Sequence, residues 1–118
     1  MRSSRDVADY MRGASARRAG VRVRGRATWL HANRPVQATE SLSVDGPSGM
    51  VEYVPGDLTL TAGAGTTLAE VREATAKHGP WLALDPYGSD DGTLGATLAT
   101  ASAGPLATAF GTPRDLTL

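Results

Sequence analysis

The residues best suited to chemistry in this sequence lie in two small clusters rich in Gly, Thr and Arg. The first cluster is Arg24-Gly25-Arg26-Ala27-Thr28, which directly follows a short run of alternating Val and Arg. A Gly at the end of a strand lets main-chain amides approach an anion without obstruction by a Cβ, so this turn can cradle a diphosphate. Taken alone, the motif also fits an ordinary turn at the end of a strand.

The second cluster is a run of small residues and hydroxyls from Gly92 to Thr100, with Gly104 beyond it. A helix that starts in such a run can present free backbone amides, and the N-terminus of a helix favours phosphate groups. The same composition also fits a helix of small residues packed closely against a strand. Both interpretations remain open at this point.

Other polar motifs are predicted to have structural roles. The G-x-G run at residues 63–65 precedes a helix but lacks a third Gly at the dinucleotide spacing, so we interpret it as a packing turn. His31 and His78 are the only histidines, and neither has an acid at ligand spacing, so no metal site is expected. Asp90 and Asp91 are adjacent in a turn, where they are expected to point apart and stay solvated rather than act as an acid–base pair.

Composition limits the classes of function. A chain of 118 residues with 41% hydrophobic and 20% charged residues is typical of one globular domain. Because it has no Cys, it has no disulfide, thiolate zinc site or cysteine nucleophile, and it fits a reducing cytoplasm. No run approaches 18 apolar residues, and charges interrupt the N-terminus too early for a secretory signal, so we expect neither export nor a membrane span.

The charge is unevenly distributed along the chain. Residues 1–36 have a balance of +7, and residues 37–118 have a balance of −7. A basic segment suits a polyanion such as a pyrophosphate or a nucleic acid, but a solvated Arg face on the first helix is the favoured explanation, since surface charge is the usual fate of such residues. A nucleic-acid module would need aromatic platforms among its basic residues, and only Trp29 lies there, so we predict no nucleic-acid partner.

The elements that position the clusters follow from the spacing of apolar residues and caps. Val7, Met11 and Ala14 share one helical stripe, and Thr67 with Glu70 forms a capping box. In the first half of the chain, the predicted elements are a helix over 4–19 capped by Ser4, a strand over 21–24, and a loop over 26–49 that can hold a strand at 41–44. A hairpin of two strands, 50–54 and 58–62, follows, and then a helix that starts at 67, buries Leu68, Val71 and Thr75, and stops at 79–80. The last predicted elements are a short strand over 81–84 and a helix over 93–101 that is ended by 104–105. This mix predicts an α+β fold.

Residues 51–118 form one continuous pattern, in which a strand leads into A-G-T-x-L-x-E and a later stretch reads T-L-G-x-x-x-A-T-x-x-x-G. This pattern resembles the FAD-linked oxidases of the vanillyl-alcohol oxidase and para-cresol methylhydroxylase (PCMH) type, especially the flavin subunit of bacterial glycolate oxidase. Arg114-Asp115 resembles the Arg-Asp strand entry of that family and is expected to be a local structural pair. The resemblance implies that residues 1–118 are the first part of a PCMH-type FAD-binding domain, through the T-L-G-x-x-x-A-T stretch, with the cap or substrate domain absent.

The resemblance also assigns site residues. In that family the first cluster reads R-G-G-G or R-G-x-G-[TSH] and binds the FAD pyrophosphate, whereas Arg26 and Ala27 depart from it here. The second cluster lines the diphosphate and ribityl side of the cofactor, and Ala96 replaces its second Gly. The implied cofactor-binding residues are Arg24, Gly25, Arg26, Ala27, Thr28, Thr93, Leu94, Gly95, Ala99, Thr100 and Gly104.

The mode of flavin binding and the reaction follow from the same resemblance. Some members carry flavin on a His in the first loop, where this chain has Ala27, Thr28 and Trp29, so non-covalent FAD is expected. The implied enzyme is an oxidoreductase that removes a hydride from a C–H beside a hydroxyl, with a 2-hydroxy acid such as glycolate as substrate and with partner oxidase subunits. No catalytic residue is assigned. The alternatives are a non-enzymatic remnant without cofactor and, ranked last, a small Arg-rich nucleic-acid-binding module.

Overall fold

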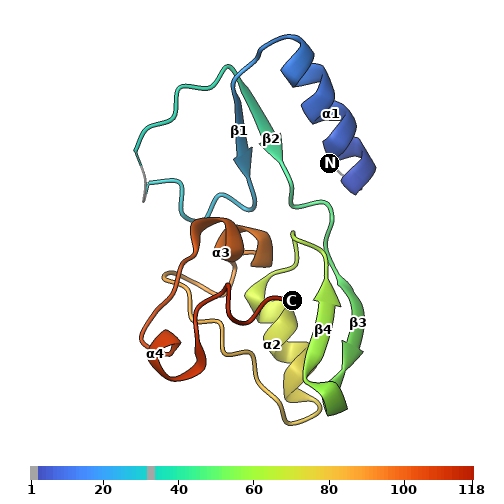
Figure 1. Cartoon of the computed structure of the whole chain (residues 1–118), viewed down its shortest axis with the longest axis vertical. Helices are drawn as coiled ribbons and strands as arrows, with labels where there is room; N and C mark the ends of the chain where they lie inside the picture. The colour runs from blue at the N-terminus through green and yellow to red at the C-terminus, as the bar shows by residue number, and fades with distance from the viewer. Residues whose placement is uncertain (1–2, 32–33) are drawn as a thin grey trace.

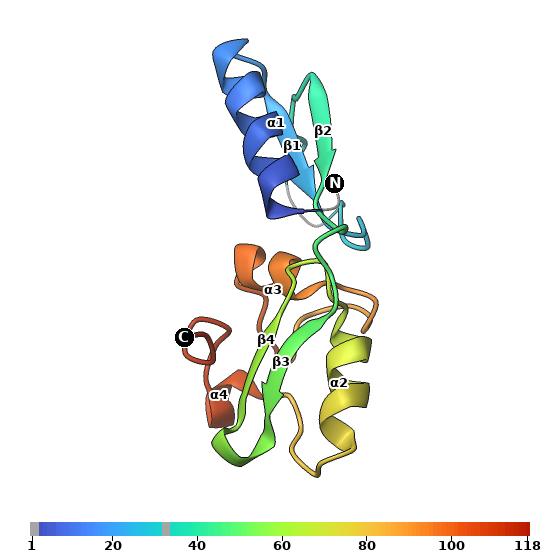
Figure 2. The same ribbon diagram turned by 90° about the vertical axis from the view of Figure 1, so that its right-hand side faces the viewer.

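The computed structural model describes residues 3–31 and 34–118 and contains short helices and two small sheets (Figure 1). In chain order the elements are α1 (Ser4–Ala16), β1 (Val21–Arg24), β2 (Glu40–Ser43), β3 (Met50–Val54), a 3₁₀ turn (Pro55–Asp57), β4 (Thr59–Ala62), α2 (Leu68–Ala76), α3 (Leu94–Thr100) and α4 (Ala107–Phe110). The predicted α+β class is confirmed. Figure 2 shows α1, β1 and β2, here called the first unit, above the second unit of β3, β4 and α2–α4.

Helix α1 starts and ends differently from the prediction. Its N-cap is Ser3 rather than Ser4, because the Ser3 hydroxyl accepts from the Asp6 amide at 3.2 Å and the Asp6 carboxylate accepts from the Ser3 amide at 3.0 Å. The helix ends at Ala16 rather than Ala19, because Arg18 adopts a left-handed conformation with φ 55°.

The first unit is a parallel strand pair covered by α1. β1 and β2 pair in parallel from Val21↔Glu40 to Arg24↔Ser43, which confirms a strand inside the predicted 26–49 loop. Residues 32–33 of that loop lie outside the described residues. Glu40 ties α1 to β2, because its carboxylate accepts from Tyr10 Oη and from Arg17 Nη2 at 3.1 Å.

The second unit contains the predicted hairpin and its adjacent helix. β3 and β4 pair antiparallel through the 3₁₀ turn, with a bulge between Met50 and Glu52. Helix α2 lies beside this hairpin (Figures 1 and 2) and begins at the predicted capping box of Thr67. The predicted buried stripe is confirmed, because Leu68, Val71 and Thr75 are all buried.

The predicted strand over residues 81–84 is wrong. No other strand lies against this segment in the described structure, and the Leu84 carbonyl accepts from Arg72 Nη2 at 3.0 Å instead. Trp81 is exposed and packs edge-on against Phe110, with ring centroids 5.1 Å apart. The apolar segment 81–84 therefore packs against neighbouring side chains and does not join a sheet.

Two other expectations near the C-terminus need correction. Helix α3 is ended by Ala101, which takes a left-handed conformation with φ 51°, so Gly104-Pro105 is not the stop signal. Arg114-Asp115 does not enter a strand, because Asp115 caps a turn by accepting from the amide and hydroxyl of Thr112 at 2.8 and 2.7 Å.

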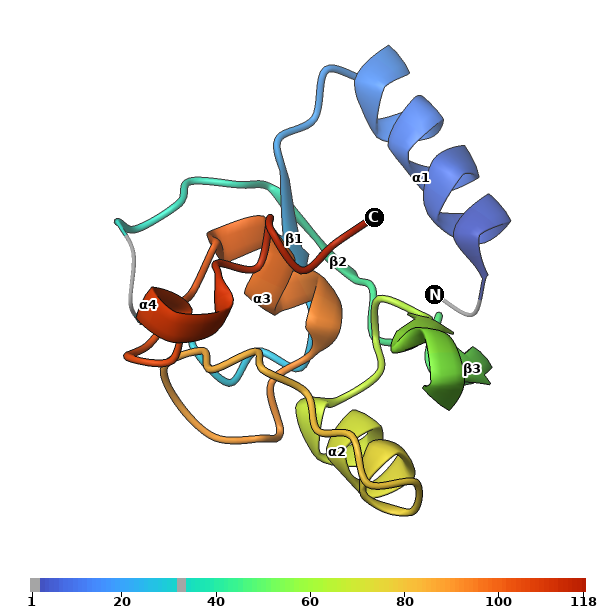
Figure 3. The same ribbon diagram turned by 60° about the horizontal axis from the view of Figure 1, so that its bottom comes forward.

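The described core is small and unusually rich in Thr. Its buried apolar residues are Ala14, Leu42, Leu68, Val71 and Leu84, and its buried polar residues are Thr66, Thr67, Thr75, Thr93 and Thr97. Buried hydroxyls need hydrogen-bond partners, and Thr97 Oγ1, for example, donates to the Thr93 carbonyl at 3.0 Å. The buried Thr93 and Thr97 place much of this core beside α3, which lies next to the end of β1 in Figures 1 and 3.

Candidate functional site

A groove of about 370 Å³ opens where the end of β1 and the loop after it face α3. Its volume falls in the range of small-molecule sites, about 300–1,000 Å³. One wall comes from the first unit and the other from the second unit. The lining residues are Arg22 to Leu30, Arg34, Pro35, Val36 and Val44 on one side, and Pro86 to Ser89, Gly92, Thr93, Gly95, Ala96, Thr97, Ala99, Thr100 and Ser102 on the other.

The fold brings both sequence clusters to this groove. Nine of the eleven residues assigned by resemblance line it, namely Arg24, Gly25, Arg26, Ala27, Thr28, Thr93, Gly95, Ala99 and Thr100. Leu94 and Gly104 are not among the lining residues. Gly104 packs closely against Asp85, because a Cβ there would lie 2.5 Å from Asp85 Oδ2 and 2.7 Å from the Asp85 carbonyl oxygen. Cofactor contact by all eleven residues stays a prediction.

The turn after β1 offers unused hydrogen-bond donors. Within the part of the chain that the structure describes, the backbone amides of Arg26, Ala27 and Thr28 donate to no protein acceptor. Ala27 takes a left-handed conformation with φ 59°, which Gly adopts more easily. Residue 27 therefore keeps a conformation that favours Gly although Gly itself is absent. Successive unpaired amides in such a turn form a concavity suited to an anion.

Close contact joins the first cluster to the second. A Cβ added to Gly25 would lie 2.7 Å from Thr93 Oγ1, so the turn approaches the start of α3 as closely as it does because residue 25 has no side chain. Thr93 is buried and caps α3, its hydroxyl accepting from the Ala96 amide at 3.2 Å. The contact places the two halves of the groove side by side.

The start of α3 does not present the free amides that the sequence suggests. The Leu94 and Gly95 amides donate to the carbonyls of Thr66 and Ala64 at 2.9 and 2.8 Å, and the Ala96 amide is taken by Thr93. These bonds attach α3 to the 63–66 turn. The second cluster therefore contributes small side chains to the groove rather than an anion-binding helix end.

The 63–66 turn is a packing element, as predicted. A Cβ on Gly63 would lie 2.4 Å from the Pro47 carbonyl oxygen, and a Cβ on Gly65 would lie 2.3 Å from that of Asp45. Backbone atoms on both sides leave no space for a side chain. The two glycines are needed for close packing of the chain around the second unit.

The charges on the groove have one sign. Among the described lining residues, four are Arg and none is Asp or Glu. Arg22 and Arg24 are held in place, Arg22 by a bond to the Val36 carbonyl at 2.6 Å and Arg24 by a bond to Ser41 Oγ at 3.2 Å. Guanidinium groups beside apolar walls suit a ligand that combines phosphate groups with flat, largely apolar rings.

The family model described as FAD binding domain matches residues 1–118, the full length of the sequence. The chain belongs to this family. Its α+β fold is consistent with the N-terminal part of a PCMH-type FAD-binding domain. No curated protein matches the chain.

The groove of this FAD-binding domain fits the family's cofactor. FAD joins a diphosphate to two planar ring systems, and the groove offers unpaired amides and Arg side chains beside the apolar Val36 and Pro86. Neither His31 nor His78 is among its described lining residues. Within the described residues, no group of three or more His, Cys, Asp or Glu side chains is arranged to hold a metal ion.

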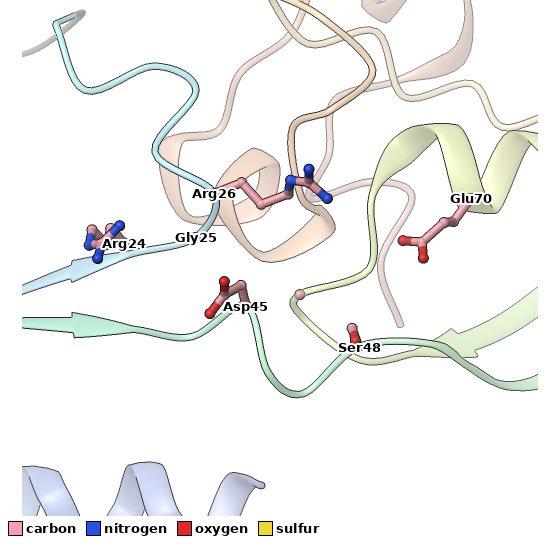
Figure 4. Close-up of a pocket in the computed structure, with 7 residues that line it drawn as sticks. Arg24, Gly25, Arg26, Asp45, Ser48 and Glu70 are labelled. Atoms are coloured by element: carbon pink, nitrogen blue, oxygen red, sulfur yellow. The ribbon is translucent and has the colours of Figure 1, made fainter. Parts of the chain in front are cut away.

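A second cavity of about 430 Å³ shares Arg24, Gly25 and Arg26 with the groove but differs in charge (Figure 4). Figure 4 shows the Arg26 side chain extending toward Glu70. Hydrogen bonds from the Thr67 amide and hydroxyl, at 2.7 and 2.9 Å, lower the pKa of Glu70, and a bond from the Ser43 hydroxyl lowers the pKa of Asp45. Two carboxylates balance two Arg, so this cavity suits a diphosphate less well.

The FAD-binding domain has a pair of groove residues that the sequence analysis missed. Trp29 and Tyr87 lie on opposite walls, with ring centroids 5.6 Å apart. Their separation along the chain hides the contact from any local motif. In the sequence, the only indication of this pair is that both residues are aromatic.

None of the helices within residues 3–31 and 34–118 combines the length and apolar character that crossing a bilayer requires.

Proposed function

We propose that this chain binds FAD non-covalently in the groove, as part of a flavin-dependent oxidoreductase. The observation that carries the proposal is the chemistry of the lining. It has three unpaired amides at the turn after β1 and four Arg with no Asp or Glu, although the Arg26 side chain extends toward Glu70 of the second cavity. The diphosphate takes its hydrogen bonds from the amides of Arg26 to Thr28, with Arg24 supplying charge. Non-covalent binding is supported by the absence of Cys from the sequence and of His from the described lining.

The bound flavin supplies a hydride acceptor, and the protein supplies position and electrostatics. The Arg side chains and amides hold the anionic centre of the cofactor, which fixes its register along the groove. Ala96 and Ala99 on α3 present small side chains, so the ligand can approach the helix closely. Thr93 and Gly25 keep the two walls in contact at one end.

The reaction that we propose is oxidation of a CH–OH group, with a 2-hydroxy acid such as glycolate as substrate. The support is the resemblance of residues 51–118 to the flavin subunit of bacterial glycolate oxidase. In this proposal residues 1–118 supply the first part of the FAD-binding domain, and a cap domain and partner oxidase subunits supply the substrate site. A cytoplasmic location fits a chain without Cys.

A second candidate function is a remnant that folds without cofactor. It is favoured by Arg26, Ala27 and Ala96, which occupy positions where the resembling family has Gly. Against it, Ala27 retains the left-handed conformation and Ala96 lies on the groove without closing it. We therefore place FAD binding first.

The test is a titration of the purified chain with FAD, followed by thermal unfolding and by visible flavin absorbance of the protein after gel filtration. FAD at 100 times its Kd stabilises a single-site protein by about 2.7 kcal/mol, which raises the Tm of a domain of this size by about 10 °C. R24Q is expected to weaken FAD binding about tenfold, because it removes a charge from the groove.

The matched control is R12Q, which removes an Arg that pairs with Asp9 on the exposed face of α1. It is expected to leave FAD affinity unchanged. Absence of any FAD-dependent change in Tm would overturn FAD binding by this chain. In that case the variant R26G/A27G/A96G is titrated with FAD in the same way. If the variant binds FAD and the natural chain does not, the hypothesis of a remnant without cofactor is supported.

Substrate class is tested on the enzyme assembled with its partner subunits. Anaerobic addition of glycolate is expected to bleach the visible flavin absorbance. Bleaching by an alcohol without a carboxylate, and not by glycolate, would contradict the 2-hydroxy acid assignment.

A further inference from the structure

Trp29 and Tyr87 form an aromatic pair on the groove. Trp29 lies in the turn directly after the first cluster, and Tyr87 lies in the turn that precedes α3. Their ring centroids are 5.6 Å apart with an interplanar angle of 34°, and the residues remain 39% and 76% exposed. The pair therefore leaves ring surface open to a ligand instead of burying it in the core.

Other aromatic contacts in the described structure have a different setting. Trp81 packs edge-on against Phe110, and Tyr53 packs edge-on against His78. None of these four residues is among the described lining of the groove. Trp29 and Tyr87 thus differ from the other ring contacts by facing the groove and by the small angle between their planes.

The position of Tyr87 is fixed by a contact with the segment that follows α3. Its backbone amide donates to Ser102 Oγ at 3.0 Å, and Ser102 also lines the groove. Pro86 and Leu30, the neighbours of the two aromatic residues, add apolar surface on either side. A flat ring that enters here meets an apolar wall within the same groove as the four Arg.

We propose that Trp29 and Tyr87 form an aromatic clamp, on whose exposed ring surface a planar ring system of FAD stacks. The ligand ring does not enter between the two side chains, because their centroids are only 5.6 Å apart. The inference rests on the proposed FAD binding, and it assigns positioning roles to two residues outside both sequence clusters. Stacking suits this geometry because both the isoalloxazine and the adenine of FAD present a π face, and offset or tilted rings attract through their quadrupoles. The amides of Arg26 to Thr28 and the Arg24 side chain serve the diphosphate, while the clamp orients one ring.

The clamp is tested by titration calorimetry of the full chain with FAD. W29L and Y87L each remove one aromatic face and are each expected to weaken FAD binding about tenfold, the loss typical of one stacking residue. W29F and Y87F keep a ring and are expected to restore most of the affinity. W81L is the matched control, because it makes the same change at the other Trp, outside the groove.

A spectroscopic readout separates stacking from a general loss of structure. FMN and ADP each carry one of the two rings with phosphate, so the ligand whose affinity falls in both W29L and Y87L identifies the ring in the clamp. If FMN is that ligand, indole contact quenches its emission, and emission of saturated FMN is expected to rise in W29L. If ADP is that ligand, it is expected to quench the emission of Trp29 in the W81L background.

The outcomes distinguish the clamp from the proposed function. If the natural chain binds FAD and both W29L and Y87L keep its affinity within twofold, the clamp is overturned and FAD binding stands. If the natural chain binds no FAD, both the clamp and the proposed function are overturned. If W29L does not fold, Y87L decides, because Tyr87 is largely exposed and its replacement leaves the core intact.

Discussion

At the scale of single residues, the contacts that an added Cβ would make show which glycines are needed for packing. Gly65 packs against backbone, because a Cβ there would lie 2.3 Å from the Asp45 carbonyl oxygen and 2.9 Å from its Cα. Real side chains do not tolerate such distances, so the chain around residue 65 would have to move. The role of this glycine is therefore to allow close packing of the 63–66 turn.

We predict that G65A lowers the free energy of unfolding by about 2–3 kcal/mol, the cost of overpacking a site that cannot relax freely. The measurement is urea unfolding of the cofactor-free chain. G56A is the matched control, because nothing lies within 4 Å of the Cβ that it adds. It is expected to be neutral or to stabilise by up to about 1 kcal/mol. Equal stability of G65A and the natural chain would show that residue 65 has no packing role.

The sequence predicts much of the groove but not its details. The groove is lined by the residues of the first cluster and by most residues of the second cluster. Both clusters could be found in the sequence because a short strand followed by Gly, and a capped helix, are local patterns. The occupied amides of Leu94 and Gly95 were not predictable, because their acceptors belong to the distant 64–66 turn. Pairing of Trp29 with Tyr87 is equally a result of tertiary structure.

At the scale of elements, capping and burial decide which predictions hold. Helix α2 begins and packs as predicted because its capping box and its apolar stripe agree. The 81–84 segment has strand-like composition, yet it lacks a neighbouring strand in the described structure. A strand needs a partner for its backbone groups, and short apolar runs contain no information about that partner.

The capping box of α2 makes a prediction about pH. Hydrogen bonds from Thr67, first from its amide and then from its hydroxyl, lower the pKa of Glu70 below its ordinary value of 4.5. Because the folded pKa lies below the unfolded one, the stabilising contribution is fully present above about pH 4.5 and is lost as pH falls through the folded pKa. The stability advantage of the natural chain over E70Q is therefore expected to shrink on acidification.

The measurement is urea unfolding of both proteins between neutral pH and about pH 3. Glu40, Asp45 and Asp115, whose pKa values are also lowered, are present in both proteins and cancel in the difference. T67S keeps the hydroxyl and is expected to retain the pH dependence of the natural chain. A difference that stays constant down to pH 3 would contradict the role of the Glu70 carboxylate.

At the scale of the whole molecule, the chain is open in shape. Its accessible surface is 8073 Å², compared with about 6,100 Å² expected for a folded monomer of 12.2 kDa. Its radius of gyration is 15.4 Å, compared with about 13.5 Å for a compact domain of this length. The two units stand one above the other (Figure 2), and the groove takes lining residues from both.

A ligand in this groove therefore contacts both units at once. We predict that FAD slows amide hydrogen exchange both in residues 22–30, at the end of β1, and in residues 93–102, around α3, because closing the groove over a ligand restricts opening on each side. The segment 50–62 of the β3–β4 hairpin lies outside the described groove lining and is the internal reference, with a smaller change expected. Mass spectrometry of peptides with and without saturating FAD makes the measurement. Protection of the 93–102 segment alone would mean that the ligand binds to the second unit without contacting the Arg-bearing turn. That result would contradict the proposal that residues 26–28 bind the diphosphate.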